Sequence, residues 1–270
     1  MNQMTSRLIS TAIGLPLAIF LIIVGGNIFN LFVLLIAMIA LYEFYDALKH
    51  KGFEPVSYIG YFFVGVLFLI LTIDISLIPI YIFFLIIAYL TIMLFFGLSI
   101  EDVSLSILGI LYVGMLFGTI ILLRQSNYGK IVTFYLLILS WGTDTFAFFI
   151  GKLIGKHKLI PQVSPNKTLE GAIGGLIISA LLSVIYIVIL DLDNIFIPNI
   201  FILYIIGLLG SMFSQLGDLA ASAIKRSCNI KDFGNIIPGH GGILDRFDGL
   251  IFVSSYLYTL LFIYNRFMFR

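Results

Sequence analysis

The sequence predicts an all-α polytopic membrane protein with about nine transmembrane helices, and three observations support this class. Hydrophobic residues make up 61% of the 270-residue chain, charged residues make up only 11%, and the mean hydropathy is +1.14. A soluble domain carries roughly 25% charged residues. The apolar runs are continuous and about 20 residues long, as in spanning helices, whereas barrel strands alternate over about ten residues. The composition therefore excludes an ordinary soluble domain, a disordered chain and a disulfide-rich secreted scaffold.

Each apolar run is close to the length of about 20 residues that crosses a hydrocarbon core of about 30 Å. The runs lie at 8–24, 28–48, 56–73, 75–97, 103–123, 131–150, 171–190, 195–217 and 249–264. Because the separators at 25–27 and 74–76 are so short, eight to ten spans are compatible with the pattern. The first run does not read as a cleavable signal peptide, since its basic start at Arg7 is weak and no small-residue cleavage site follows.

The distribution of basic residues predicts the orientation of the spans. With nine spans, one side of the membrane receives 11 of the 15 Lys and Arg residues. Loops rich in Lys and Arg remain in the cytoplasm. We therefore expect a cytoplasmic N-terminus and place the polar segments 151–170 and 218–248 on the cytoplasmic side.

The segment 218–248 concentrates ionisable groups in a chain that is otherwise nearly uncharged. These groups are Asp218, Lys225, Arg226, Lys231, Asp232, His240, Asp245, Arg246 and Asp248. A solvated connecting loop is the simple alternative, but ionisable residues at membrane depth are functional by default. Apolar residues and four glycines also run through the segment. Helical spacing places Asp218 and Lys225 on one helix face, and Asp245 and Asp248 on one face of the next helix.

Carboxylates gathered in this way form an oxygen-rich site, which suits Mg²⁺. A zinc site is disfavoured, because the chain has one cysteine, Cys228, and three scattered histidines. Cations interleaved with metal-binding carboxylates are what transfer chemistry on a polyphosphate requires. The sequence contains no P-loop, no HExxH and no GxSxG motif, so direct in-line displacement is the simpler mechanism.

Two further places carry charge. The segment 151–170 holds four lysines. Three of them, Lys152, Lys156 and Lys158, are explained as well by a role in orienting the spans as by a role in a site. Lys167 differs, because it follows a Ser-Pro-Asn turn just before a predicted helix, where an anion is favoured. Asp144 lies within the sixth run, where insertion costs about 2.5–3.5 kcal/mol. We expect Asp144 to face the polar site, the alternative being a hydrogen bond between helices. Glu43, near the end of the second run, receives no role.

Three stretches of the sequence resemble a known family. The run 222–248 reads SAIKRSCNIKDFGNIIPGHGGILDRFD and is similar throughout to the signature of the phosphatidate cytidylyltransferases, also called CDP-diacylglycerol synthases. The stretches WGTD at 141–144 and SPNKTLEG at 164–171 resemble the same family. The length and span number agree with that family, while the first five runs match it only as hydrophobic helices.

The resemblance implies an integral membrane enzyme that converts CTP and phosphatidate to CDP-diacylglycerol and pyrophosphate with Mg²⁺. It also implies a homodimer in the bacterial inner (cell) membrane with a cytoplasmic active site. Residues 1–130 would form about five N-terminal spans and residues 131–270 the catalytic region. No DNA or RNA partner is expected.

The resemblance also assigns roles to individual residues. The residues expected to ligate metal are Asp144, Asp218, Asp245 and Asp248. Those expected to bind substrate phosphate are Lys167, Lys225, Arg226, Lys231, His240 and Arg246. The catalytic group comprises Asp218, Lys225, Arg226, Asp245 and Asp248. Arg246 and His240 would either contact phosphate or brace an aspartate.

Three alternatives remain open. The enzyme could transfer CMP to another membrane lipid, or it could use CTP to phosphorylate a polyprenol. A transporter is an alternative of a different class, but it would spread its charges through several spans, whereas here they are concentrated in 218–248.

Overall fold

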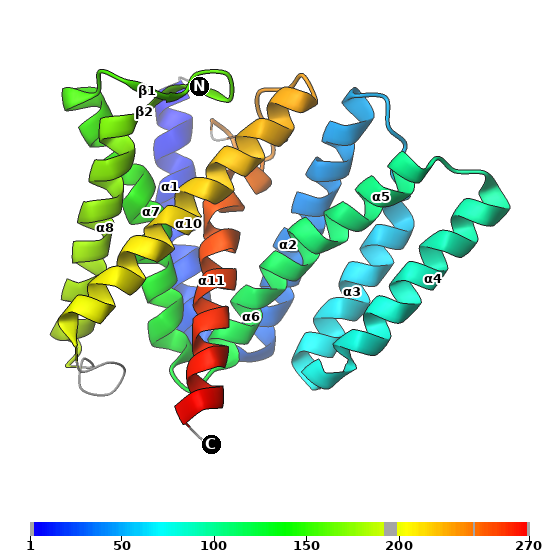
Figure 1. Cartoon of the computed structure of the whole chain (residues 1–270), viewed down its shortest axis with the longest axis horizontal. Helices are drawn as coiled ribbons and strands as arrows, with labels where there is room; N and C mark the ends of the chain where they lie inside the picture. The colour runs from blue at the N-terminus through cyan, green and yellow to red at the C-terminus, as the bar shows by residue number, and fades with distance from the viewer. Residues whose placement is uncertain (1–2, 192–198, 240, 269–270) are drawn as a thin grey trace. The chain divides into compact units, whose positions relative to one another are not determined.

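A computed structural model describes residues 3–191, 199–239 and 241–268, and its structure is almost entirely helical (Figure 1). In these described ranges, seven helical segments are long and apolar enough to cross a membrane. They are Gly26–His50, Ile75–Phe96, Ile100–Gln125, Gly129–Ile154, Leu169–Ile189, Ile200–Ser227 and Leu244–Arg266. Two shorter apolar helices are Ala12–Val24 and Ser57–Ile73. The all-α polytopic class is thus confirmed, while the count of nine spans stays a prediction. The eighth predicted run begins at 195, outside the described residues.

The chain folds into two compact units. The first unit comprises Met1–Asn127 and Lys225–Arg246, and the second comprises Tyr128–Ile224 and Phe247–Arg270. Packing therefore groups much of the charged segment 218–248 with the N-terminal helices. The division at residue 130 concerns function and stays a prediction.

The first unit is built around a central helix, α2. Its elements are α1 (Gln3–Val24), α2 (Gly26–His50), α3 (Ser57–Ile73), the 3₁₀ turn η1 (Ile75–Leu77), α4 (Ile78–Phe96), α5 (Ile100–Gly109), the π-helical turn η2 (Ile110–Met115) and α6 (Leu116–Gln125). Helix α2 contacts α1, α3, α5, η2 and α6. The segments α5, η2 and α6 follow one another without a break and form one helical segment that is long and apolar enough to cross a membrane.

Small residues let the neighbouring helices approach α2. The Tyr45 side chain of α2 is fully buried and donates a hydrogen bond of 2.7 Å to the carbonyl of Ser106. A Cβ atom at Gly60 or at Gly109 would overlap the Tyr45 ring. Since helices in lipid associate by close packing rather than by the hydrophobic effect, these two glycines fix how α3 and α5 lie against α2.

The second unit contains α7 (Gly129–Ile154), α8 (Leu169–Ile189), most of α10 (Ile200–Ser227) and most of α11 (Leu244–Met268). Helices α7 and α8 lie side by side (Figure 1). A Cβ atom at Gly175 would lie 2.8 Å from the carbonyl oxygen of Thr143 and 2.9 Å from the Ala147 Cβ. One turn on, the Ser179 hydroxyl donates to the carbonyl of Ile138 at 3.2 Å. Small residues on one face of α8 thus bring its backbone against α7.

A short antiparallel pair of strands precedes α8. Strand β1 (Lys158–Ile160) pairs with β2 (Ser164–Thr168), and α8 begins at the next residue. The Thr168 side chain caps α8 by accepting a hydrogen bond of 3.2 Å from the Gly171 amide. This hairpin places Lys167 two residues before the helix.

Gly175→Val is expected to separate α7 from α8 and to lower the melting temperature of the detergent-solubilised protein by several degrees. The matched control is Gly14→Val on α1, where an added Cβ has nothing within 4 Å apart from its own stretch of helix backbone. Melting followed by circular dichroism tests the difference, and equal melting temperatures for the two variants would contradict this account of the α7–α8 contact.

Candidate active site

The charged segment of the first unit is organised by a buried ion pair. The Lys225 Nζ lies 2.6 Å from the Asp245 Oδ1, and the two side chains are only 10% and 2% exposed. The second oxygen, Oδ2, accepts hydrogen bonds from the backbone amides of Phe233 at 2.8 Å and Gly242 at 3.0 Å. The Lys225 ammonium also lies 5.4 Å from the centroid of the Phe233 ring. Burying two charges costs several kcal/mol per ion, and these additional donors and the ring offset that cost.

The turn that closes this segment requires glycine. Gly241 has a φ of 85°, and a Cβ there would lie 3.1 Å from the Asp245 Oδ2. Ile237 donates a backbone hydrogen bond of 2.9 Å to the carbonyl of Gly241. A left-handed backbone is accessible to glycine without strain, so the glycine-rich sequence allows the turn to pass close to the carboxylate.

A carboxylate on α2 also reaches this segment. Glu43 is 1% exposed and accepts hydrogen bonds from the amides of Ile243 at 2.9 Å and Leu244 at 2.8 Å. These amides open α11. Glu43, which received no role from the sequence, therefore accepts hydrogen bonds from the backbone next to Asp245.

In the second unit, a second ion pair joins the hairpin to α10. The Lys167 ammonium contacts the Asp218 carboxylate, and Asp218 accepts a hydrogen bond of 3.4 Å from the Ser222 hydroxyl. The two charged side chains are 30% and 25% exposed. This pair is more open to solvent than Lys225–Asp245, so both partners are accessible to a ligand.

Glu170, in the first turn of α8, holds the start of the hairpin. Its carboxylate accepts hydrogen bonds from the backbone amides of Lys156 at 3.0 Å and His157 at 3.2 Å. It also lies 2.6 Å from the His157 Nδ1. The hairpin that carries Lys167 is therefore attached to α8 at its beginning as well as at its end.

Helices α10 and α11 approach closely beside two of the expected carboxylates. A Cβ at Gly217 would lie 2.4 Å from the carbonyl oxygen of Asp248, and one at Gly249 would lie 2.9 Å from the carbonyl oxygen of Ser214. Gly217 immediately precedes Asp218, and Gly249 immediately follows Asp248. The Asp248 Oδ1 accepts a hydrogen bond of 2.7 Å from the Gly249 amide. This backbone contact sets the separation of the helices that carry Asp218 and Asp248.

The other expected residues are mostly at the surface. Arg226 donates a hydrogen bond of 3.2 Å to the carbonyl of Ile230, while Lys231 and Arg246 are exposed. Asp144, on α7, is exposed within its unit. His240 lies outside the described residues.

The chemistry of the carboxylates fits a hard divalent cation. Asp144, Asp218 and Asp248 belong to the second unit and offer only oxygen, the donor that Mg²⁺ prefers. Asp245 differs, because its oxygens already accept three hydrogen bonds from Lys225, Phe233 and Gly242. Over 3–191, 199–239 and 241–268, no three His, Cys, Asp or Glu side chains are gathered closely enough to hold a metal ion by themselves. Substrate phosphate oxygens and water would have to complete the coordination of any ion.

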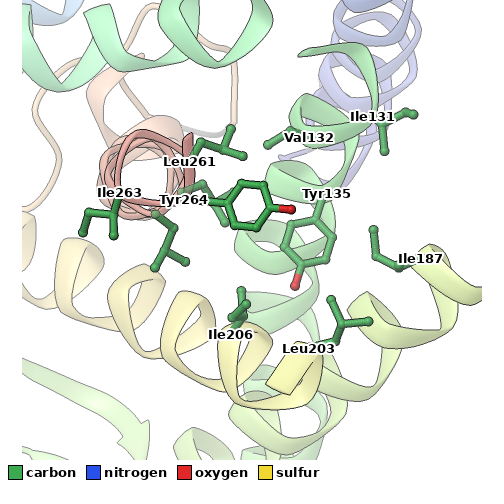
Figure 2. Close-up of a pocket in the computed structure, with 11 residues that line it drawn as sticks. Ile131, Val132, Tyr135, Ile187, Leu203, Ile206, Leu261, Ile263 and Tyr264 are labelled. Carbon is green, nitrogen blue, oxygen red and sulfur yellow. The ribbon is translucent and has the colours of Figure 1, made fainter. Parts of the chain in front are cut away.

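A cavity of about 290 Å³ lies in the second unit, at the helix ends that are remote from Lys167 and Asp218 (Figure 2). Its walls come from the start of α7, the end of α8, the start of α10 and the end of α11. Figure 2 shows Tyr135 and Tyr264 with their rings beside this space. None of the lining residues described there is charged. The cavity therefore does not suit a nucleotide, and it lies away from Lys167 and Asp218.

Comparisons with known proteins identify the family. The sequence profile of the cytidylyltransferase family matches residues 5–264. The chain belongs to the cytidylyltransferase family. It is 37% identical to a phosphatidate cytidylyltransferase of Bacillus subtilis over 98% of this chain and 100% of that protein. It is 35% identical to one of Staphylococcus haemolyticus over 96% of this chain and 99% of that protein.

A third similar protein, a phosphatidate cytidylyltransferase of Staphylococcus saprophyticus, is 42% identical over 60% of each chain. Membership of the family makes this chain an enzyme of the nucleotidyltransferase class. The resemblance drawn from 222–248, 141–144 and 164–171 is confirmed.

Two carboxylates that anchor backbone amides, Glu43 and Glu170, were not predicted from the sequence. Glu170 stood within the resembling stretch 164–171, but nothing in its spacing indicated that it binds the amides of Lys156 and His157. Glu43 did carry a signal, because a carboxylate within an apolar run is costly unless it has a partner. Its partners lie 200 and 201 residues away, which local patterns do not reveal.

Removing either partner of the buried pair should destabilise the enzyme. Lys225→Ala or Asp245→Ala leaves one buried charge uncompensated, which costs about 3–5 kcal/mol, whereas the double variant should lose less than the sum of the two. Thermal melting in detergent measures this, with Asp232→Ala at an exposed carboxylate of the same segment as the control. Strictly additive losses would show that the two side chains do not interact.

Proposed function

We propose that this enzyme is a phosphatidate cytidylyltransferase, which converts CTP and phosphatidate to CDP-diacylglycerol and pyrophosphate. The observation that carries the proposal is the similarity over nearly the full length to the enzyme of that name from Bacillus subtilis. The apolar helices support a substrate whose diacyl tails stay in the bilayer. The proposed reaction needs positive charge beside the phosphate oxygens and does not need a covalent nucleophile of the protein.

The reaction is a direct displacement. An oxygen of the lipid phosphate attacks the α-phosphorus of CTP, the bond from the α-phosphorus to the bridging oxygen of the β-phosphate breaks, and pyrophosphate leaves with that electron pair. The attacking phosphate is already an anion at neutral pH, so a strong general base is not needed. Repulsion between this anion and the triphosphate opposes the reaction, and fixed cations that hold both groups in line lower the barrier.

Six cationic or ionisable side chains are assigned to substrate phosphate: Lys167, Lys225, Arg226, Lys231, His240 and Arg246. Lys167 is paired with Asp218, and Lys225 is paired with Asp245. To bind a phosphate, each lysine exchanges a carboxylate oxygen for a phosphate oxygen or shares itself between them. The more exposed Lys167 makes this exchange at a smaller cost in desolvation.

The acidic residues are assigned to Mg²⁺. Asp144, Asp218, Asp245 and Asp248 are the residues assigned to hold the ion, and each would do so through carboxylate oxygen. When bound, Mg²⁺ supplies positive charge to the phosphate oxygens. Asp218, Lys225, Arg226, Asp245 and Asp248 form the catalytic group of the proposal.

The proposed setting follows from the charges of the loops. Eleven of the 15 Lys and Arg residues fall on one side of a nine-span chain, which supports a cytoplasmic N-terminus and a cytoplasmic active site. The bacterial relatives support the bacterial inner (cell) membrane as the location. A homodimer and a catalytic region at 131–270 with its cytoplasmic segments 151–170 and 218–248 belong to the same proposal.

The proposal predicts that purified enzyme forms labelled CDP-diacylglycerol from labelled CTP, phosphatidate and Mg²⁺, and that EDTA abolishes this activity. Asp218→Asn and Asp248→Asn should each lower kcat about 100-fold or more, since each removes a charge from the reacting centre. Asp74→Asn, in the short connection between α3 and η1, is the matched control and should retain activity.

Three results would contradict these assignments. Full activity of the Asp218→Asn/Asp248→Asn double variant would remove the metal proposal. Conversion of a polyprenol or another lipid phosphate in preference to phosphatidate would change the substrate. Cysteine-accessibility labelling of 218–248 from outside the cell would overturn the proposed orientation.

A further inference from the structure

Glu43 is a buried carboxylate to which the proposed reaction assigns no contact with substrate or metal. It lies in α2, about two turns before the exposed, basic end of that helix, and is 1% exposed. A carboxylate in an apolar helix is expensive to bury without donors. The backbone amides that donate to Glu43 therefore indicate its role.

Both carboxylate oxygens of Glu43 are used. Oε1 accepts from the Ile243 amide at 2.9 Å, and Oε2 accepts from the Leu244 amide at 2.8 Å. Amides at the start of a helix lack partners within that helix, and a negative charge there is stabilised by the helix dipole. Glu43 thus fixes the first residues of α11 to α2.

Two glycines show how closely the charged segment surrounds this carboxylate. An added Cβ at Gly234 would lie 2.5 Å from the Glu43 Oε1, and one at Gly242 would lie 2.6 Å from each oxygen. Any larger residue at either position would displace the carboxylate. The segment therefore contacts Glu43 through its backbone at two places as well as through the two hydrogen bonds.

The same stretch of backbone holds Asp245. Gly242 contacts Glu43 and donates its amide to the Asp245 Oδ2, while Leu244, which is bonded to Glu43, immediately precedes Asp245. Asp245 in turn holds Lys225 at 2.6 Å. A displacement of the backbone at 242–244 would move Asp245 and release its contact with Lys225.

We propose that Glu43 is a positioning residue that holds the start of α11 so that Asp245 and Lys225 keep their places for the reaction. The proposal rests on the proposed function only where it says that these two residues serve catalysis. It assigns Glu43 no contact with substrate. Its structural content, that Glu43 keeps 242–245 in place, can be tested without any assay of activity.

Cys228 provides a reporter for this test. It is the single cysteine of the chain, it is 2% exposed, and it lies just after α10, between Lys225 and the glycine-rich turn. Its rate of alkylation by a maleimide in the full-length, detergent-solubilised protein reports opening of this segment. Glu43→Gln keeps the size of the side chain but loses the charge and one of the two acceptors.

We expect Glu43→Gln to raise the rate of Cys228 alkylation about tenfold and to lower kcat about tenfold, with the KM for CTP little changed, as loss of a charged hydrogen bond would produce. Glu43→Asp, whose carboxylate is one methylene shorter, should show a smaller increase and serves as the test if Glu43→Gln fails to fold. Asp46→Asn removes a partly exposed carboxylate from the same helix and is the charge control.

Phe44→Leu is the packing control. It changes a fully buried neighbour of Glu43 in α2 and lowers stability without touching the carboxylate. An alkylation rate in Glu43→Gln equal to that of the wild type would overturn the proposal, as would an equal increase in Phe44→Leu at the same loss of melting temperature. If the wild-type enzyme forms no CDP-diacylglycerol, the proposed function fails, while the alkylation rates still decide what Glu43 holds.

Discussion

The backbone of the charged segment 218–248 follows a path that is set by one buried ion pair, Lys225–Asp245. Lys225 and Asp245 cannot be left unsatisfied in this environment, because an uncompensated buried charge costs several kcal/mol. The amides of Phe233 and Gly242 satisfy the remaining oxygen of Asp245, and this requirement fixes the path of the backbone around it. The glycines follow from the same requirement, since the turn must pass within contact distance of a carboxylate.

Each unit repeats this arrangement with different exposure. In the first unit the pair is sealed by backbone donors and by Phe233, whereas in the second unit Lys167 and Asp218 remain partly exposed. A buried pair favours a single conformation. A partly exposed pair exchanges partners more readily, because its charges have lost less of their hydration. Lys167 and Asp218 can therefore exchange partners with a charged ligand at a smaller desolvation cost than Lys225 and Asp245.

Close backbone contacts position the carboxylates. In lipid the hydrophobic effect does not drive one helix onto another, so small residues decide where helices touch. Gly217 and Gly249 are adjacent in sequence to Asp218 and Asp248, and each would clash with backbone atoms of the other helix if it carried a Cβ. The same principle holds α8 on α7 through Gly175, at the level of Thr143 and beside Asp144.

The sequence by itself determined the helical membrane class, the approximate positions of the spans, the two polar segments and the family. These are properties of composition and of short-range order: hydropathy over about 20 residues identifies a span, helical spacing places Asp245 beside Asp248, and the run 222–248 is a contiguous signature. Only the tertiary structure decided which charges are partners. Lys225 is bonded to Asp245 across 20 residues and Lys167 to Asp218 across 51, while Glu43 meets α11 across 200. Such pairings arise from the packing of distant helices, and no periodicity within a single helix encodes them.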